Sequence, residues 1–237
     1  MDNKIDMRLP ISVNEATIKR HYAKHLGELV ADDVLDSMHD AMQLGREAAE
    51  HALEAHEKIM GNIMLTEIAR QRQSRDATFR FFESASKRID AARDRAERAI
   101  SHIEAATSSP GEPKSAAEAF QRAEIRNVLA GMSPDQRAKA IGEAIDTDDR
   151  DVLMAALVGP VMLTALGNAE REALKDRWRR KKFPDQVDRQ RRLRAALKDL
   201  DRGQALLMTF IMGLTDGDAI AKAEAAEAAA LTASKVA

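Results

Sequence analysis

The sequence predicts an all-α protein in which a long helical rod or helical hairpin, coiled-coil-like, precedes a compact bundle of short helices. Residues 11–109 hold no proline and only three glycines (Gly27, Gly45 and Gly61), and nearly all the others are good or tolerable helix formers. No convincing alternating run of β-branched residues occurs, so strands are not expected. Aromatic residues make up 3% of the chain and charged residues 32%, a composition that, with abundant alanine, is typical of long helices and coiled coils.

Prolines and glycines divide the chain into five predicted parts. They are an N-terminal arm at 1–12, the long helix or hairpin at 13–107, a linker at 108–113, the small helical bundle at 114–214, and an alanine-rich tail at 215–237. Pro10 blocks a helix before Ile11, and Ser12 or Asn14 can cap the helix that follows. The linker has two prolines and a glycine in six residues. The tail is expected to be either helical and frayed or disordered.

The long segment has an apolar stripe that continues into two heptad repeats. The stripe steps by four residues from Ile18 to Met42. The first repeat places Leu35, Met42, Ala49, His56 and Ile63 at one seam position, and Met38, Gly45, Ala52, Ile59 and Thr66 at the other. The second places Phe82, Ile89, Ala96 and Ile103 at one position, and Ala85, Ala92 and Ala99 at the other. Small residues at these positions allow helices to approach closely.

The two repeats are out of phase, and the polar residues 67–78 separate them. The helix either continues through this region as an exposed stalk, or the chain reverses near Gly61 and Asn62. A continuous or gently broken helix is the favoured interpretation.

Shorter helices with clear start and stop signals are expected after the linker. Ser133 and Gln136 form a capping box with Pro134 at the first helical position. Gly159 and Pro160 end a later helix, and Pro184 begins the last long one, which reaches Met212. Residues 205–214 are apolar on nearly all sides, which predicts a helix that is buried all round.

Residues 132–160 resemble helical proteins encoded in phage and prophage structural gene clusters. The resemblance is carried by the capping box at Ser133, by Asp148 and Asp149, and by the apolar run Val152 to Leu157 before Gly159 and Pro160. It implies a place in a phage or prophage particle or its assembly, and it brings no catalytic residues with it.

Charge is unevenly distributed although the net charge is only −2. Residues 28–57 hold nine acids and one base, whereas residues 175–194 hold ten bases and three acids. The basic segment has three interpretations: a solvated face, a partner of the acidic face within or between chains, or a nucleic-acid contact in which a ring stacks on a base. The candidate interaction residues are Arg177, Trp178, Arg179, Arg180, Lys181, Lys182, Arg189, Arg191, Arg192 and Arg194.

The histidines include a candidate metal site and one residue in the heptad seam. His21, His25 and Glu28 share one face if their segment is helical, as the ligands of a zinc site on a helix would. An exposed polar face is the favoured interpretation, because no supporting ligand cluster is recognisable elsewhere. His56 in the heptad seam is either a pH-sensitive, register-setting group or a residue at the solvated edge of the seam, and the latter is favoured.

These patterns favour a non-enzymatic structural or assembly protein that acts through helix–helix contacts, and a homo-oligomer with protein partners is expected. The alternative is a nucleic-acid-associated regulator that uses the basic residues 175–194. No cofactor or metal is expected. The absence of cysteine suits a reducing cytoplasm, and no apolar run reaches the ~18 residues of a membrane span. A cytoplasmic protein, or one within an assembled particle, is therefore expected.

Overall fold

The computed structural model describes residues 13–111, 113–158 and 166–236. The fold is all-α, and the described chain divides into two compact units. Unit 1 comprises residues up to Arg98 together with Arg192–Ala237, and unit 2 comprises Ala99–Arg191. Helices α3 and α8 each belong to both units. No helix formed by the described residues is both long and apolar enough to cross a membrane.

The first part of unit 1 is not the continuous helix that the stripe from Ile18 predicted. A short helix, α1 (Ala16–Lys19), is followed by a small antiparallel hairpin of β1 (Lys24–His25) and β2 (Glu28–Leu29). Leu26 and Gly27 turn the chain with positive φ angles of 51° and 88°. A positive φ is unfavourable for most residues but easy for glycine, so the four-residue spacing fails at this turn.

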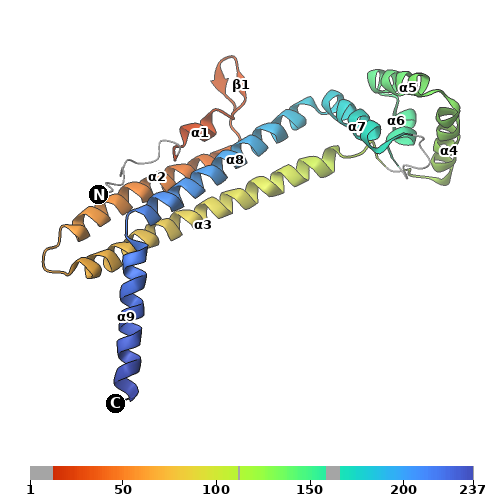
Figure 1. The fold of residues 1–237 in the computed structure, drawn as a ribbon. Helices are drawn as coiled ribbons and strands as arrows, with labels where there is room; N and C mark the ends of the chain where they lie inside the picture. Colours follow the sequence, from red (N-terminus) through yellow and green to blue (C-terminus); the bar gives the residue numbers. More distant parts are fainter. Residues whose placement is uncertain (1–12, 112, 159–165, 237) are drawn as a thin grey trace. The chain divides into compact units, whose positions relative to one another are not determined.

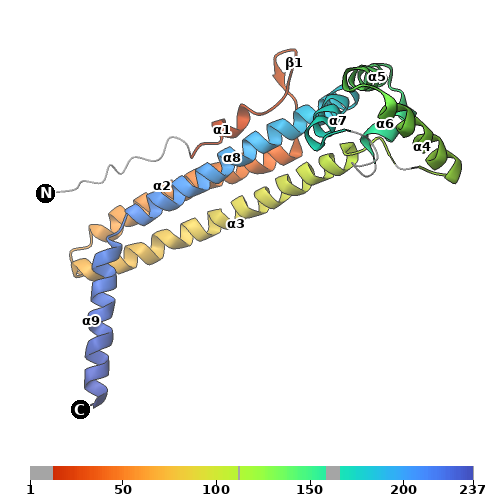
Figure 2. The same ribbon diagram turned by 45° about the vertical axis from the view of Figure 1, so that its right-hand side comes forward.

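The long segment is a helical hairpin, so the favoured interpretation as one continuous helix was wrong. Helix α2 (Asp33–Met60) begins at Asp32, whose side chain accepts a hydrogen bond from the backbone N–H of Val34. It ends at Gly61, and α3 (Glu67–Thr107) runs back beside it (Figures 1 and 2). The reversal lies at the site that the alternative interpretation named.

The two predicted heptad repeats form the inner faces of this hairpin. Leu35, Met38 and Met42 on α2 and Ile89 and Ala96 on α3 are at most 1% exposed. The first repeat stops after His56, because Ile63 lies in the turn and is 87% exposed. The phase break between the repeats thus marks the turn and not a stalk.

The third helix of the unit 1 bundle is the later part of α8 (Pro184–Gly213), which was predicted to belong to the small bundle at 114–214. A Cβ placed on Gly45 of α2 would lie 3.6 Å from Leu207 Cδ2 of α8 and 3.7 Å from Ile89 Cδ1 of α3. The three helices therefore meet at this level. Hydrogen bonds from Arg93 to Asp201 and from Gln204 to Ser86 show that α8 runs antiparallel to α3.

The α8 core residues lie on one side of the helix. Leu193, Leu200 and Leu207 are fully buried and Leu214 is 5% exposed, at a seven-residue spacing. Met212 is 62% exposed, so residues 205–214 are not buried all round as predicted. The predicted tail forms helix α9 (Gly217–Val236). Of the two expected alternatives, a helix or a disordered segment, the structure therefore has the helix.

The described residues of unit 2 form four short helices, α4 (Ala116–Gly131), α5 (Pro134–Thr147), α6 (Arg150–Leu157) and α7 (Asn168–Lys182). The predicted capping box at Ser133 and Gln136 is present. The helices share one core. Its buried members are Leu129, Ile141, Ala144, Ile145, Leu153, Ala156, Leu157, Leu166 and Trp178. The predicted helical turn at 161–166 falls mainly outside the described residues.

Candidate functional site

Trp178, the ring proposed to stack on a nucleic-acid base, belongs to the core of unit 2. Its side chain is 4% exposed, and its ring packs edge-on against Phe183 with the ring centroids 5.5 Å apart. A base could stack on this indole only if the side chain left the core. The aromatic part of the predicted nucleic-acid interface is therefore structural.

Three cations on either side of Trp178 on α7 contact acids at the end of α5. Lys181 Nζ lies 3.2 Å from Asp146 Oδ1, and Arg177 Nη2 lies 3.1 Å from Asp146 Oδ2. Lys182 pairs with Asp148, which ends α5 in a left-handed conformation. The hydrogen bond and positive charge of Lys181 hold the pKa of Asp146 below its ordinary value. These partners lie outside the acidic face at 28–57 that the sequence suggested.

The remaining basic candidates have different roles. Arg179 donates two hydrogen bonds to Thr107 Oγ1 and one to Gln190 Oε1, so it joins α7 to α3 and α8. Arg180 and Arg191 pair with Asp176 and Asp188 on their own helices. Arg192 Nη1 donates to the His21 carbonyl oxygen at 3.5 Å. Arg189 and Arg194 lie on α8, one in each unit, so the candidate set does not form one local cluster.

The histidine metal hypothesis fails on geometry, because its segment is not a helix. His25 and Glu28 face each other across the β1–β2 hairpin. His21 Nε2 instead lies 2.5 Å from Asp199 Oδ2, which also accepts a 2.6 Å hydrogen bond from Arg20. Burial alone would raise the pKa of Asp199, but the hydrogen bonds from His21 and Arg20 lower it below the ordinary value. Within the described residues no group of three or more acids and histidines is arranged to hold a metal ion.

His56 is buried in the seam and does not lie at a solvated edge. Its Nδ1 lies 2.8 Å from the Oγ of Ser74, across the α2–α3 hairpin. Burial lowers the pKa of His56 below its ordinary value, and the nearby Glu57 opposes this shift only in part. The neutral imidazole is therefore the form that the folded hairpin favours.

The contact between α3 and α9 is the feature that sequence reasoning missed. Arg72 Nη1 and Arg75 Nη1 each lie 2.8 Å from an Oε1 atom, of Glu227 and Glu224 respectively. The sequence held a signal for this contact, because the two arginines and the two glutamates are each spaced three residues apart and so lie on one face of their helices.

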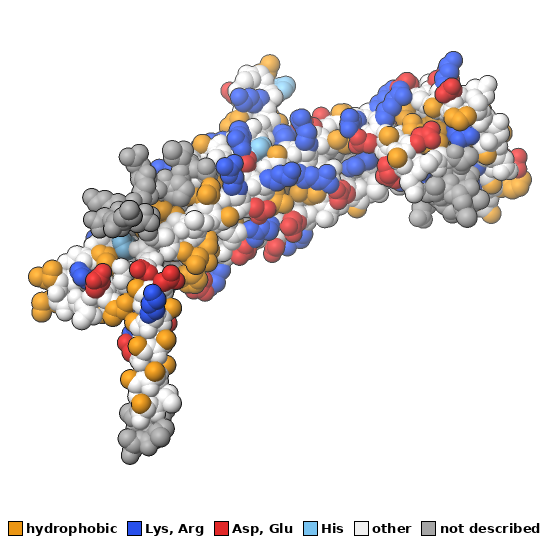
Figure 3. Space-filling view, in the orientation of Figure 1, with side chains coloured by type: hydrophobic (Ala, Val, Ile, Leu, Met, Phe, Trp, Pro, Cys, Tyr) orange, Lys and Arg blue, Asp and Glu red, His pale blue; other side chains and the backbone are white. Residues whose placement is uncertain are grey.

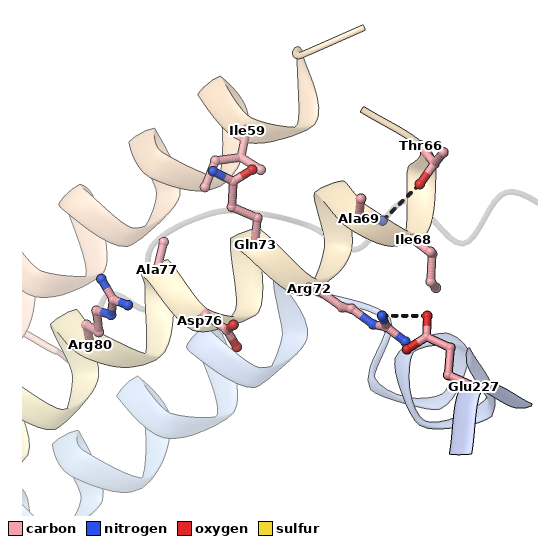
Figure 4. A pocket seen from close by; sticks show the side chains of 10 residues that line it. All are labelled: Ile59, Thr66, Ile68, Ala69, Arg72, Gln73, Asp76, Ala77, Arg80 and Glu227. Carbon is pink, nitrogen blue, oxygen red and sulfur yellow. Dashed lines mark hydrogen bonds and ion pairs between the residues drawn. The ribbon is translucent and has the colours of Figure 1, made fainter. Parts of the chain in front are cut away.

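A hollow of about 640 Å³ lies beside this contact (Figure 4). Ile59 of α2, Ile68 and Ala77 of α3, and Glu227 of α9 line it together with Arg72. Arg72 reaches across to Glu227 through Nη1, whereas its Nε and Nη2 are buried and have no hydrogen-bond partner. At Glu224 and Glu227, α9 is thus held to α3 through ion pairs, with space left between the helices.

Beyond this contact, α9 extends away from the bundle helices of unit 1 (Figures 1 and 2). Every residue from Glu224 to Ala233 is exposed, including Leu231 at 63%. Figure 3 shows apolar side chains along this helix with few charges among them. No family model, curated protein or solved structure matches the chain.

Proposed function

We propose that this chain is a non-enzymatic structural or assembly protein that acts through helix–helix contacts and works as a homo-oligomer. The observation that carries the proposal is α9, whose residues 224–233 are exposed along their whole length. Most helical stability in proteins comes from the packing of one face of the helix against a neighbour, and the exposed part of α9 has no such packing within the described residues. A second helix supplied by another chain would give α9 that packing.

The composition of α9 supports a helix as its partner. Six of the ten residues from Glu224 to Ala233 are alanine, and Leu231 provides the one large apolar side chain among them. Small side chains let two helix backbones approach closely, so that many weak contacts add up along the helices. The resemblance of residues 132–160 to phage and prophage helical proteins supports the narrower proposal of a component of such a particle or a scaffold-like assembly factor.

The proposal is tested with the full chain and one charged substitution on α9. We expect sedimentation equilibrium to give an oligomer whose dissociation constant rises at least about tenfold in Leu231→Glu, because a carboxylate would be buried without a partner. Leu44→Glu, at a 41% exposed position on α2, is the matched control and should leave the mass unchanged. A monomer at every concentration, or equal effects of the two substitutions, would count against the proposal.

A further inference from the structure

The acidic residues of α9 match the basic residues of α3 in their spacing along the helix. Arg72 pairs with Glu227 and Arg75 with Glu224, so the order of residues along α9 is the reverse of the order along α3. The pattern needs only an α3 and an α9 side by side. It does not require the two helices to come from one chain.

Within one chain this contact is shallow. Among the α9 residues whose burial is described, 217–233, Ile220 is the one large apolar side chain that is buried, at 1% exposed, and the glutamates that follow it are about half exposed. The hollow beside Arg72 shows that α3 and α9 are not closely packed at this point. The attachment therefore rests on one buried side chain and on solvent-screened ion pairs.

The connection from α8 to α9 has the properties of a hinge. Gly213 ends α8 and Gly217 begins α9, and a Cβ placed on either would have no atom within 4 Å. Between them, the Asp216 backbone N–H donates an exposed 3.1 Å hydrogen bond to Gln71 Oε1 of α3. Leu214 is buried, whereas Asp216 and Gly217 are exposed, so a change of direction at residues 215–217 would leave the core packing of Leu214 in place.

Large apolar side chains lie exposed near this hinge. Phe79, 45% exposed, lies on α3 between Gln71, which contacts the hinge, and Ser86, which contacts Gln204 of α8. Met212, 62% exposed, lies on α8 between Gln204 and Asp216 and therefore beside the same stretch of α3. If two copies met at their hinges, they would cover these side chains with each other.

We propose that two copies of this chain exchange their α9 helices, so that Glu224 and Glu227 of each copy pair with Arg75 and Arg72 of the other. The exchange keeps every contact that α9 makes within one chain, and it adds two contacts between the copies, one between the hinges around Phe79 and Met212 and one along the exposed part of α9 that carries Leu231. This inference rests on the proposed oligomer and specifies how the oligomer forms. It commits to a second copy of the chain as the partner.

Charge complementation between two full-length variants tests the exchange. One chain carries Arg72→Glu and Arg75→Glu, and the other carries Glu224→Arg and Glu227→Arg. Each variant has only like charges at this contact, whether it folds alone or pairs with itself. In an exchanged mixed dimer, acid meets base at every one of these positions. We expect native mass spectrometry of the mixture to show mixed dimers well above the share given by random pairing.

Crosslinking gives a second readout and exploits the absence of cysteine from the chain. Arg75→Cys and Glu224→Cys are placed on separate, differently tagged chains, which are mixed, refolded and treated with a short bismaleimide. We expect a crosslink between the two chains. Ser86→Cys with Gln204→Cys is the matched control, because this α3–α8 contact stays within one chain and should crosslink only when both cysteines are on the same chain.

The outcomes separate this inference from the function it rests on. Mixed dimers in excess, with the expected crosslink between chains, support the exchange. Dimers that pair at random and crosslink Arg75→Cys to Glu224→Cys only within one chain overturn the exchange and leave the oligomer intact. Monomers at all concentrations overturn both.

Discussion

His56 Nδ1 and Ser74 Oγ lie 2.8 Å apart, and they join α2 to α3 close to the turn of the hairpin. Both side chains are buried, at 8% and 0% exposed. A polar pair at this depth is tolerated because each partner satisfies the other. The alignment of α2 with α3 near the turn therefore depends on the protonation state of the His56 imidazole.

We predict that the stability of unit 1 falls as the pH is lowered below about 6.5, the ordinary pKa of histidine. The folded pKa of His56 is lowered by burial, so the unfolded chain binds the proton more tightly and stability declines from that pH down to the folded pKa. The slope from this group is at most about 1.4 kcal/mol per pH unit. Urea unfolding followed by circular dichroism at several pH values measures it.

His56→Gln should remove this part of the pH dependence, since glutamine does not titrate. His102→Gln, at an exposed position on α3, is the control and should keep it. An unchanged pH profile in His56→Gln would show that His56 is not the responsible group.

Two glycines in the three-helix core are predicted to respond oppositely to alanine. At Gly45 a Cβ would make ordinary contacts at 3.6 Å and beyond, so Gly45→Ala should stabilise by about 0.5–1 kcal/mol through helix propensity. At Gly203 a Cβ would lie 2.6 Å from Met42 Sδ and nearer still to Cε. Since Met42 is fully buried, Gly203→Ala should lower the free energy of unfolding by about 1–2 kcal/mol, even after the gain in helix propensity is included.

Denaturant unfolding of the two glycine variants checks this prediction. The double variant Gly203→Ala with Met42→Leu removes the atoms in the overlap and should recover part of the loss. Similar shifts in Gly45→Ala and Gly203→Ala would mean that α2 and α8 do not approach most closely at Gly203.

Trp178 is predicted to hold the core of unit 2 together. It is the only tryptophan, so its fluorescence reports this unit alone, and the native emission should be that of a buried indole that shifts to the red on unfolding. Trp178→Ala should cost about 3–5 kcal/mol in the free energy of unfolding, and Trp178→Phe less. An emission maximum typical of exposed indole, or a loss below about 1 kcal/mol in Trp178→Ala, would contradict this role.

The basic segment is predicted not to bind nucleic acid in a salt-sensitive way. Lys181 and Lys182 pair with Asp146 and Asp148, and the ring that would stack on a base is buried. Fluorescence anisotropy with a labelled DNA duplex at about 50 mM salt tests this prediction, with Arg180, Lys181 and Lys182 all changed to Glu as the comparison. Binding by the natural chain that the charge-reversed variant loses would revive the alternative function. Arg179 is left unchanged because its bonds to Thr107 are structural.

The sequence predicted the parts of the fold that depend on local spacing. Seam residues such as Leu35 and Ile89 were placed correctly because a buried heptad position is visible in the order of residues alone. The turn after Met60 was identified only as the less favoured interpretation, since a phase break is compatible with both a stalk and a reversal. The hairpin at Leu26 and Gly27 was missed because residues before and after it keep the helical spacing by chance.

Contacts between segments far apart in the chain could not be predicted from local residue spacing. The seven-residue spacing of Leu193, Leu200 and Leu207 predicts a buried face on their helix. It does not predict which other helices pack against that face. The pairing of Arg72 and Arg75 with Glu224 and Glu227 likewise requires the fold that brings α9 back to α3. The candidate basic residues failed as one site because their partners, such as Asp146, belong to another helix.

The mass of the full chain in solution tests the central claim most directly. Sedimentation equilibrium over a range of concentrations should give an oligomer of at least two chains, which Leu231→Glu shifts toward the monomer. A mass of 26.1 kDa at every concentration, the value of a single chain, would contradict an assembly protein built on contacts between its own helices.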